Sequence, residues 1–334
     1  MIFVTGGTGL LGSQLLYDLV SQGKEVRAIY RSKSRLSSVA HLFSYRSAEN
    51  GTDLFDKIEW VEGDILDIPV LMEHMKDCSE VYHCAGLVSF HPKDHSDVFK
   101  INREGTANMV NVALELGINK FCHVSSTAAV GGDHTAPITE ATKWKNGEVT
   151  SGYSLSKNAA EREVWRAKEE GLNVVIVNPS VILGPGNWNE TSLTIFQTVS
   201  KGLKFYPPGS NATVDVRDVS SIMIHLMDSE IEGERYLCIG SNQSFKALMT
   251  EISLQLEIDP PTKEAKRWQV EIARWALKIV KGLTGSRSAI TKETVHNLFA
   301  HKRYDTTKVE KALNFQFRSL SDQVSDSIAG RYQR

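Results

Sequence analysis

The stretch Ile2-Phe3-Val4-Thr5-Gly6-Gly7-Thr8-Gly9-Leu10-Leu11-Gly12 decides the fold. A short apolar run stands before the glycines, and residues 13–20 have the composition of a helix. Between a strand and a helix, Gly6 allows a tight turn, Gly9 lets backbone N–H groups approach a pyrophosphate, and Gly12 lets the helix pack closely. The positive end of the helix dipole adds to the attraction for phosphate. The stretch therefore predicts a dinucleotide-binding turn.

Strand and helix signals alternate over the first half of the chain. After the opening strand, further strands are expected at residues 25–30, 58–61, 80–84, 120–124 and 173–177. Helices are expected between them at 36–45, 69–75, 105–116 and 154–169. This alternation predicts an α/β fold with a doubly wound parallel sheet and helices on both faces. We expect a dinucleotide-binding domain at 1–180 and a smaller substrate-binding region at 181–334, with a segment near 210–240 returning to the main domain.

One later helix, expected at residues 268–283, is amphipathic. Trp268, Ile272, Trp275 and Ile279 fall on one of its faces. Such a face packs against a protein core or lies on a membrane surface. We expect the first arrangement.

Composition narrows the class of protein. The chain has 334 residues, 41% hydrophobic and 23% charged, with a formal net charge of -2. This balance gives no field that attracts nucleic acid or an acidic membrane, and no apolar run is long enough to span a bilayer. The four cysteines have no C-x-x-C spacing, and His91 and His95 lack further ligands for a metal. We expect a cytoplasmic protein without nucleic-acid, membrane or metal partners, as a monomer or homodimer.

Two further motifs carry chemistry. Tyr153 and Lys157 stand four residues apart, so on a helix they share a face. A free tyrosine has a pKa of about 10, and a nearby ammonium lowers it, which suits the phenol for proton transfer to a carbinol oxygen. The run Val124-Ser125-Ser126-Thr127 ends the fifth strand, where ligands of open α/β sheets bind. A hydroxyl there can orient a substrate oxygen toward Tyr153.

Together these residues resemble the extended short-chain dehydrogenase/reductase family, also called the NAD-dependent epimerase/dehydratase family, with its Rossmann-type sheet. The matching motifs are Thr5–Gly12, Gly63–Ile65, Cys84–Gly86, Asn102–Thr106, Ser125–Thr127 with Tyr153 and Lys157, and Val214–Val219. Asn178-Pro179 stands where the family usually has Arg-Pro. Residues 26–31, 184–186 and 304–308 look most like the dihydroflavonol-reductase-like branch.

The resemblance implies roles for these residues. Lys157 holds the nicotinamide ribose and lowers the pKa of Tyr153, which is the acid–base group. The orienting hydroxyl belongs to Thr127 or Ser126, of which we favour Thr127. The residues expected to bind the cofactor are Gly6, Thr8, Gly9, Leu10, Leu11, Gly12, Arg31, Arg35, Asp64, Ile65, Cys84, Ala85, Gly86, Asn102, Tyr153, Lys157, Pro179 and Val181.

The end of the second strand indicates the type of dinucleotide. An acidic residue there binds the ribose 2′-hydroxyl of NAD, whereas an arginine accommodates the 2′-phosphate of NADP. Here Arg31 ends the strand, Ser32, Lys33 and Arg35 follow, and no Asp or Glu is present. We expect NADP(H) to be preferred, with NAD(H) as the alternative.

Aromatic content suggests the substrate. The segments after the fourth, fifth and sixth strands should bound it. Their candidate contacts are Val88, Ser89, Phe90, Ala129, Asp133, Val181, Asn187, Trp188 and Tyr206. We expect an NADP-dependent reductase or dehydrogenase of a small, partly apolar carbonyl or alcohol. The alternatives are a nucleotide-sugar epimerase or dehydratase, or a hydroxysteroid-type dehydrogenase, with bound NAD, and a cofactor sensor without turnover.

Overall fold

A computed structural model describes residues 1–131, 137–144, 151–284 and 291–332. Within that part of the chain, the main sheet has seven strands, all parallel, in the order β10-β6-β5-β4-β1-β2-β3. Their bounds are β1 (Ile2–Thr5), β2 (Val26–Tyr30), β3 (Glu59–Glu62), β4 (Glu80–His83), β5 (Lys120–Val124), β6 (Val174–Pro179) and β10 (Glu234–Cys238). The strand order reverses between β1 and β4, where doubly wound sheets open a ligand crevice. The predicted fold class is confirmed.

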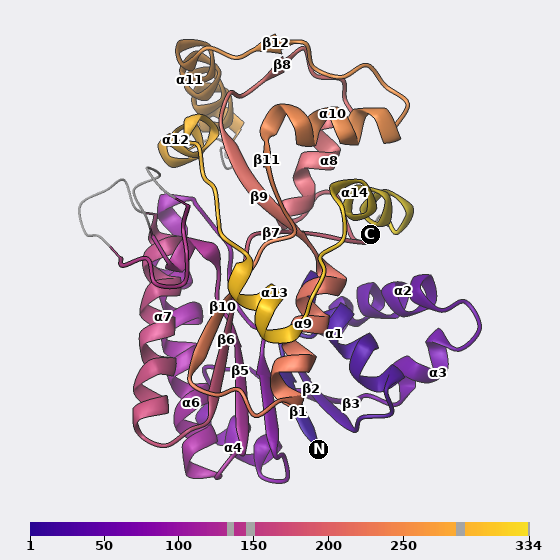
Figure 1. The fold of residues 1–334 in the computed structure, drawn as a ribbon, viewed down its shortest axis with the longest axis vertical. Coiled ribbons are helices and arrows are strands. Elements are labelled where there is room, and N and C mark those ends of the chain that lie inside the picture. The colour runs from indigo at the N-terminus through magenta and orange to yellow at the C-terminus, as the bar shows by residue number, and fades with distance from the viewer. Residues whose placement is uncertain (132–136, 145–150, 285–290, 333–334) are drawn as a thin grey trace.

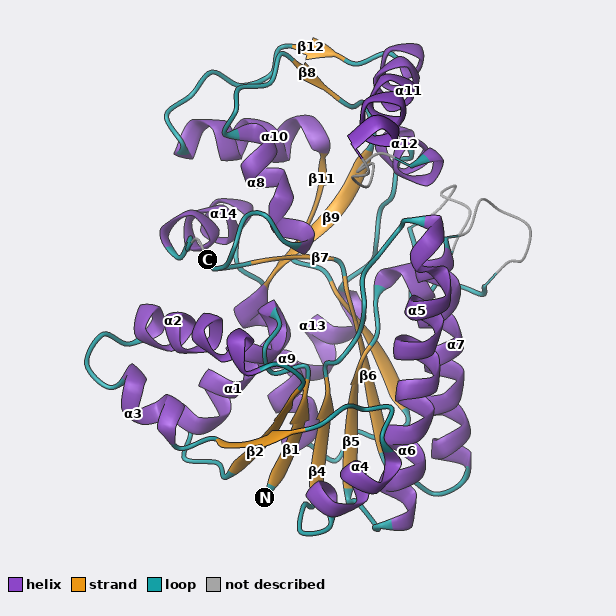
Figure 2. Ribbon diagram, turned by 180° about the vertical axis from the view of Figure 1, so that it is seen from behind, coloured by secondary structure: helices purple, strands orange, loops and turns teal. Residues whose placement is uncertain are grey.

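Helices cover both faces of this sheet (Figures 1 and 2). One face carries α4 (Ile68–Met75), α6 (Gly105–Glu115) and α7 (Gly152–Glu169), and the other carries α1 (Leu10–Ser21), α2 (Leu36–Arg46), α3 (Gly51–Asp56) and α9 (Val216–Asp228). Successive side chains of a strand point to opposite faces. Accordingly Phe3 is buried among one set of helices and Val4 among the other. The inner strands β1, β5 and β6 are buried on both sides and form the base of the site.

The C-terminal region builds a second layer above the carboxyl ends of these strands (Figure 1). It contains the sheet β11-β9-β7 and the short pair β12-β8. Its strands are β7 (Val181–Leu183), β8 (Phe205–Tyr206), β9 (Ser210–Asp215), β11 (Ser241–Ser244) and β12 (Lys263–Glu264). Its helices are α8 (Thr194–Val199), α10 (Phe245–Gln255), α11 (Arg267–Thr284), α12 (Lys292–Phe299) and α14 (Leu320–Ala329). We call this layer the cap.

Two connections join the cap to the main sheet. The chain leaves the cap at β9, forms α9 against the main sheet, and enters that sheet as its edge strand β10. The buried Asp326 of α14 pairs with Arg46 of α2 at 2.6 Å. The division of the chain at residue 180 stays a prediction.

Helix α11 differs from the expectation. Trp268, Ile272, Trp275 and Ile279 were expected to face a core. The first three are 59%, 60% and 62% exposed, and the side chain of Ile279 lies outside the described residues. That prediction was wrong because helical spacing reports which residues share a face and says nothing of what covers the face. Among the described helices, none is long and apolar enough to cross a membrane.

Candidate active site

The glycine turn lies at the carboxyl end of β1. Gly6 has φ +70°, and a Cβ added there would lie 2.5 Å from the backbone nitrogen of Ala85. A Cβ on Gly12 would overlap the carbonyl oxygen of Gly6. Helix α1 begins after Gly9 with no side-chain cap on its first amide groups. Glycine is therefore required at two positions, and the uncapped helix terminus suits a pyrophosphate.

The other residues expected to bind the cofactor lie around the same edge. Arg31 follows β2, Asp64 and Ile65 follow β3, Cys84 to Gly86 follow β4, and Pro179 and Val181 stand at the β6–β7 junction. The buried Asn102 accepts a hydrogen bond from Leu87 N–H at 2.7 Å and donates to Leu87 O at 3.0 Å. Gly86 lies close to the Lys157 side chain, because a Cβ added to Gly86 would lie 3.2 Å from the Lys157 Nζ. This edge therefore fits a dinucleotide.

The two expected arginines differ in their surroundings. Arg31 is mostly exposed, with its side chain 3.9 Å from a carboxylate oxygen of Asp64. Arg35 forms a shorter ion pair with Glu190 of the cap, at 3.1 Å. Arg31 is the better placed of the two to meet a phosphate after β2, because its present partner is more distant.

Tyr153 lies in the first turn of α7, which starts two residues earlier than predicted because Ser151 caps it. The Ser151 hydroxyl accepts a hydrogen bond from Ser154 N–H at 2.8 Å. Tyr153 is buried, and its ring meets Phe90 edge-on with the centroids 5.4 Å apart. Burial raises the pKa of the phenol, and a hydrogen bond with Ser126 opposes that rise. The phenol is therefore held in its protonated form.

Lys157 lies one turn further along α7 and is buried. Its ammonium donates a hydrogen bond to Val124 O at 2.9 Å. Burial lowers the pKa of Lys157 to about 8. The lysine was expected to lower the pKa of Tyr153, but in this structure the burial of the phenol dominates and the phenol pKa is raised.

The hydroxyl beside Tyr153 belongs to Ser126. Its oxygen accepts a hydrogen bond from Ala128 N–H at 3.1 Å, and its side chain hydrogen-bonds Tyr153. Thr127, the favoured candidate, instead hydrogen-bonds Tyr304 of the cap. Thr127 lines the same cavity as Ser126 and Tyr153, so the preference for Thr127 stays a prediction.

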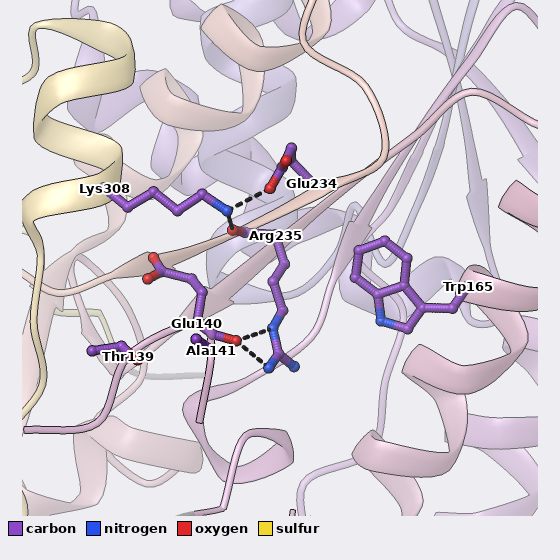
Figure 3. Close-up of a pocket in the computed structure, with 7 residues that line it drawn as sticks. All are labelled: Thr139, Glu140, Ala141, Trp165, Glu234, Arg235 and Lys308. Carbon is purple, nitrogen blue, oxygen red and sulfur yellow. Dashed lines mark hydrogen bonds and ion pairs between the residues drawn. The ribbon is translucent and has the colours of Figure 1, made fainter. Parts of the chain in front are cut away.

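A buried chain of polar side chains holds the Ser126 backbone in place. Asn178 Nδ2 donates to Ser126 O at 2.9 Å and to Glu161 of α7 at 2.6 Å. Glu161 pairs with Arg235 of β10 at 3.2 Å. Figure 3 shows Arg235 beside Glu140, whose backbone oxygen accepts from its guanidinium at 3.0 Å. Asn178, the departure from the usual Arg-Pro, thus links the Ser126 backbone to α7.

The hollow drawn in Figure 3 is a second, smaller cavity of about 400 Å³. Its charged groups pair with one another, as when Lys308 donates to Glu234 at 2.5 Å and to Arg235 O at 2.9 Å. It lies at the edge strand β10, away from the glycine turn. We assign it no ligand.

The main cavity, of about 840 Å³, joins the carboxyl edge of the sheet to the cap. Ser126, Tyr153 and Lys157 line it on the sheet side. Val88, Ser89 and Phe90, expected as substrate contacts, also line it. So do the expected cofactor residues Leu10, Leu11, Cys84, Gly86, Pro179 and Val181. The hydroxyl of Ser125 lines it too, buried and without a hydrogen-bond partner among the described residues.

Four residues expected to touch substrate lie elsewhere. Ala129 is buried in the short helical turn at Thr127–Ala129. Trp188 is buried in the cap, where its indole donates to Ser327 O at 3.1 Å and stacks on Phe196. Asn187 is buried beside it, and Tyr206 packs against the same cap core. Of the described residues lining the main cavity, none is among these four, because residue type and place in the sequence do not separate a core from a binding site. Asp133 lies outside the described residues.

Sequence reasoning missed the cap side of the cavity. Helix α12 and the segment after it supply a polar wall, and its residues are Thr291, Glu293, Thr294, His296, Asn297, Leu298, Lys302 and Tyr304. Thr291 and Thr294 form a capping box at the start of α12, which was a usable signal for the helix. No sequence signal places this short helix at the main cavity.

Comparison with known proteins agrees with this geometry. A family model of the NAD dependent epimerase/dehydratase family matches residues 2–238. A putative dihydroflavonol 4-reductase of Synechocystis sp. (strain ATCC 27184 / PCC 6803 / Kazusa) is 27% identical over 98% of this chain and 93% of its own. Sterol demethylase protein B of Methylococcus capsulatus (strain ATCC 33009 / NCIMB 11132 / Bath) is 30% identical over 72% of this chain and 69% of its own.

A solved structure shows the same fold along the whole chain. The crystal structure of gox2253 superposes with a TM-score of 0.80 and 27% identity, covering 99% of this chain and 97% of that one. The matched span of the family model holds the glycine turn, Ser126, Tyr153 and Lys157. The chain belongs to the NAD dependent epimerase/dehydratase family and is an NAD(P)-dependent oxidoreductase of the extended short-chain type.

Proposed function

We propose that the chain is an NADP-dependent reductase or dehydrogenase acting on a bulky, mostly apolar, ring-bearing carbonyl or alcohol. The observation that carries this proposal is the cavity of about 840 Å³ that has Tyr153 and Ser126 on its sheet side. Val88 and Phe90 add exposed apolar surface beside the phenol. A cavity of this size accommodates a ring compound next to a nicotinamide.

The residues have distinct roles in the proposed reaction. A bound nicotinamide supplies or accepts the hydride at the substrate carbon. Ser126 donates a hydrogen bond to the substrate oxygen and orients it. Tyr153, held protonated by burial, gives its proton to that oxygen in the direction of reduction. Lys157 keeps a positive charge below the phenol and holds the ribose of the cofactor, while the cap excludes water.

The preference for NADP rests on charge at the end of β2. Arg31 and Lys33 are exposed there, and the following turn has no acidic residue. An arginine at this point suits a 2′-phosphate by charge-assisted hydrogen bonds. Arg35 is less available because it pairs with Glu190.

The names of two relatives guide the choice of substrates. One is called a dihydroflavonol 4-reductase and the other a sterol demethylase protein, and both names point to fused-ring substrates. We therefore propose a panel of a dihydroflavonol, a ketosteroid, an aliphatic aldehyde and a nucleotide sugar. Oxidation of NADPH is followed by its absorbance, and Tyr153→Phe is the matched inactive control.

The expected result is turnover of a ring ketone by the wild type and little by Tyr153→Phe. Turnover of the nucleotide sugar alone, in a protein purified with one equivalent of bound NAD, would assign the site to the epimerase type. Nucleotide binding with no turnover of any carbonyl would assign it to a cofactor sensor.

A further inference from the structure

Helix α11 presents an apolar face that the described protein leaves uncovered. Trp268, Ile272 and Trp275 recur at helical spacing on one side, each about three-fifths exposed. Exposed apolar residues are common singly, but a contiguous group with two tryptophans marks an interaction site. We call these three residues the α11 face.

Another exposed aromatic lies close to the start of α11. Phe205 is 44% exposed, and its strand β8 pairs with Lys263 of β12, four residues before α11 begins. In Figures 1 and 2, β8, β12 and α11 gather at the end of the molecule farthest from the N-terminus. The apolar surface therefore lies at one extremity, where a flat partner can reach it.

The net charge of the segment around the α11 face is positive, whereas the net charge of the whole chain is negative. Residues 263–281 contain six basic residues and two acidic ones, although the chain has a net charge of -2. Lys266 and Arg267 are exposed directly before Trp268. Tryptophan on one face with lysine and arginine around it is the pattern of a helix that lies in the interface of an anionic membrane.

This pattern favours a lipid surface over a protein partner. Protein interfaces are enriched in tryptophan but depleted in lysine, whereas membrane-surface helices carry lysine on their polar side. We propose that α11 docks the protein on the surface of an anionic lipid bilayer, with Trp268, Ile272 and Trp275 at the level of the headgroups. Because α12 packs beside α11 and lines the main cavity, docking brings that cavity to the lipid surface.

The test is flotation of the purified full-length protein with vesicles. Vesicles of phosphatidylcholine alone are compared with vesicles of equal parts phosphatidylcholine and phosphatidylglycerol. We expect binding to the mixed vesicles, weakened by added salt because surface charges are screened, and a blue shift of tryptophan fluorescence. Binding to neither vesicle would overturn the proposal.

A matched pair of variants isolates the α11 face. Ile272 on α11 and Leu254 on α10 are both 60% exposed. Ile272→Ser should lower the partition coefficient at least about ten-fold, whereas Leu254→Ser should leave it unchanged. Both should keep the thermal midpoint of the wild type, since exposed side chains add little to stability. Equal binding by the two variants would assign the contact to another surface.

Charge is tested separately. The double change Lys266→Glu with Arg267→Glu should abolish the preference for anionic vesicles. The control, Lys57→Glu with Lys76→Glu, alters two exposed lysines of the main domain and should retain that preference. If sedimentation velocity instead finds a dimer that Ile272→Ser dissociates, a second copy covers the α11 face and the lipid proposal fails.

Discussion

The carboxyl edge of the main sheet and the cap above it share one cavity but are built differently. At the sheet edge, Ser126, Tyr153 and Lys157 are tied to buried backbone and side chains. On the cap side, the wall comes from α12, a helix of eight residues, and the neighbouring α11 exposes its apolar face. We therefore propose that the chemistry stands on the sheet edge and that the choice of substrate depends on the cap.

Removal of the phenolic oxygen should have the largest effect. Tyr153→Phe should lower kcat by about 10²–10⁴-fold, because general acid–base catalysis contributes that much. NADPH affinity should change little, since the ring still packs against Phe90. Single-turnover kinetics and fluorescence titration of NADPH check both statements.

The matched control for this prediction is Tyr206→Phe. Tyr206 lies in the cap outside the described lining of the main cavity, so its change should leave kcat unaltered. If Tyr153→Phe keeps near wild-type turnover while folded, as judged by circular dichroism, the sheet edge does not hold the acid–base group.

The next largest effect should come from removing the hydroxyl of Ser126, compared with removing that of Thr127. Ser126→Ala should lower kcat by about 10²-fold, the usual loss when one donor to a developing oxyanion is removed. Thr127→Ala removes only a hydrogen bond to Tyr304 of the cap, so it should cost about 1 kcal/mol of stability and little turnover. Steady-state kinetics and urea unfolding of both variants decide the matter. The opposite order of kcat values would restore Thr127 as the orienting residue.

The sequence predicted the sheet edge well because its motifs have fixed backbone roles. Gly6 and Gly12 are required by contacts with neighbouring backbone, so their identity reports geometry directly. The choice between Ser126 and Thr127 could not be made, because it depends on the turn after β5 and on where Tyr304 returns.

The cap was harder to predict for a physical reason. Trp188 and Trp268 look alike in sequence, yet one is buried against α14 and the other is exposed on α11. Burial there depends on contacts between distant segments, which local periodicity does not encode. The wall made by α12 has the same origin, since its helix comes to line the main cavity only through the tertiary fold.

The buried ammonium of Lys157 makes stability depend on pH. The pKa of Lys157 is about 8 in the folded protein, compared with its ordinary value of 10.5. Between these values the unfolded chain binds more protons, so the free energy of unfolding gains a contribution as pH rises. The Lys157→Met variant lacks this pH-dependent contribution because methionine does not titrate. Wild type should therefore gain about 2 kcal/mol relative to Lys157→Met between pH 7 and pH 10.

Urea unfolding of both proteins across that range measures this difference. Groups whose pKa does not depend on Lys157, such as the thiols of Cys78 and Cys238, cancel in the comparison. The hydrogen bond to Val124 shifts the two curves by a constant amount and does not change their slopes. If the free energies of unfolding of the two proteins changed with pH in parallel, the ammonium of Lys157 would be hydrated in solution and the site would be more open than in the structure.

The smallest expected effect concerns the cofactor, and it compares two arginines at the boundary of the two regions. Arg31→Ser should weaken NADPH binding by about ten-fold, because one charge-assisted contact to phosphate contributes about 1.5–3 kcal/mol. NADH binding should change by less than about two-fold on the same argument, since its ribose has no 2′-phosphate.

Arg35→Ser is the matched control. Its side chain pairs with Glu190, so it should weaken NADPH binding less. Calorimetric titrations of both cofactors against both variants test this order. Equal losses for NADPH and NADH in Arg31→Ser would remove the 2′-phosphate from this position and leave NAD as the cofactor of the site.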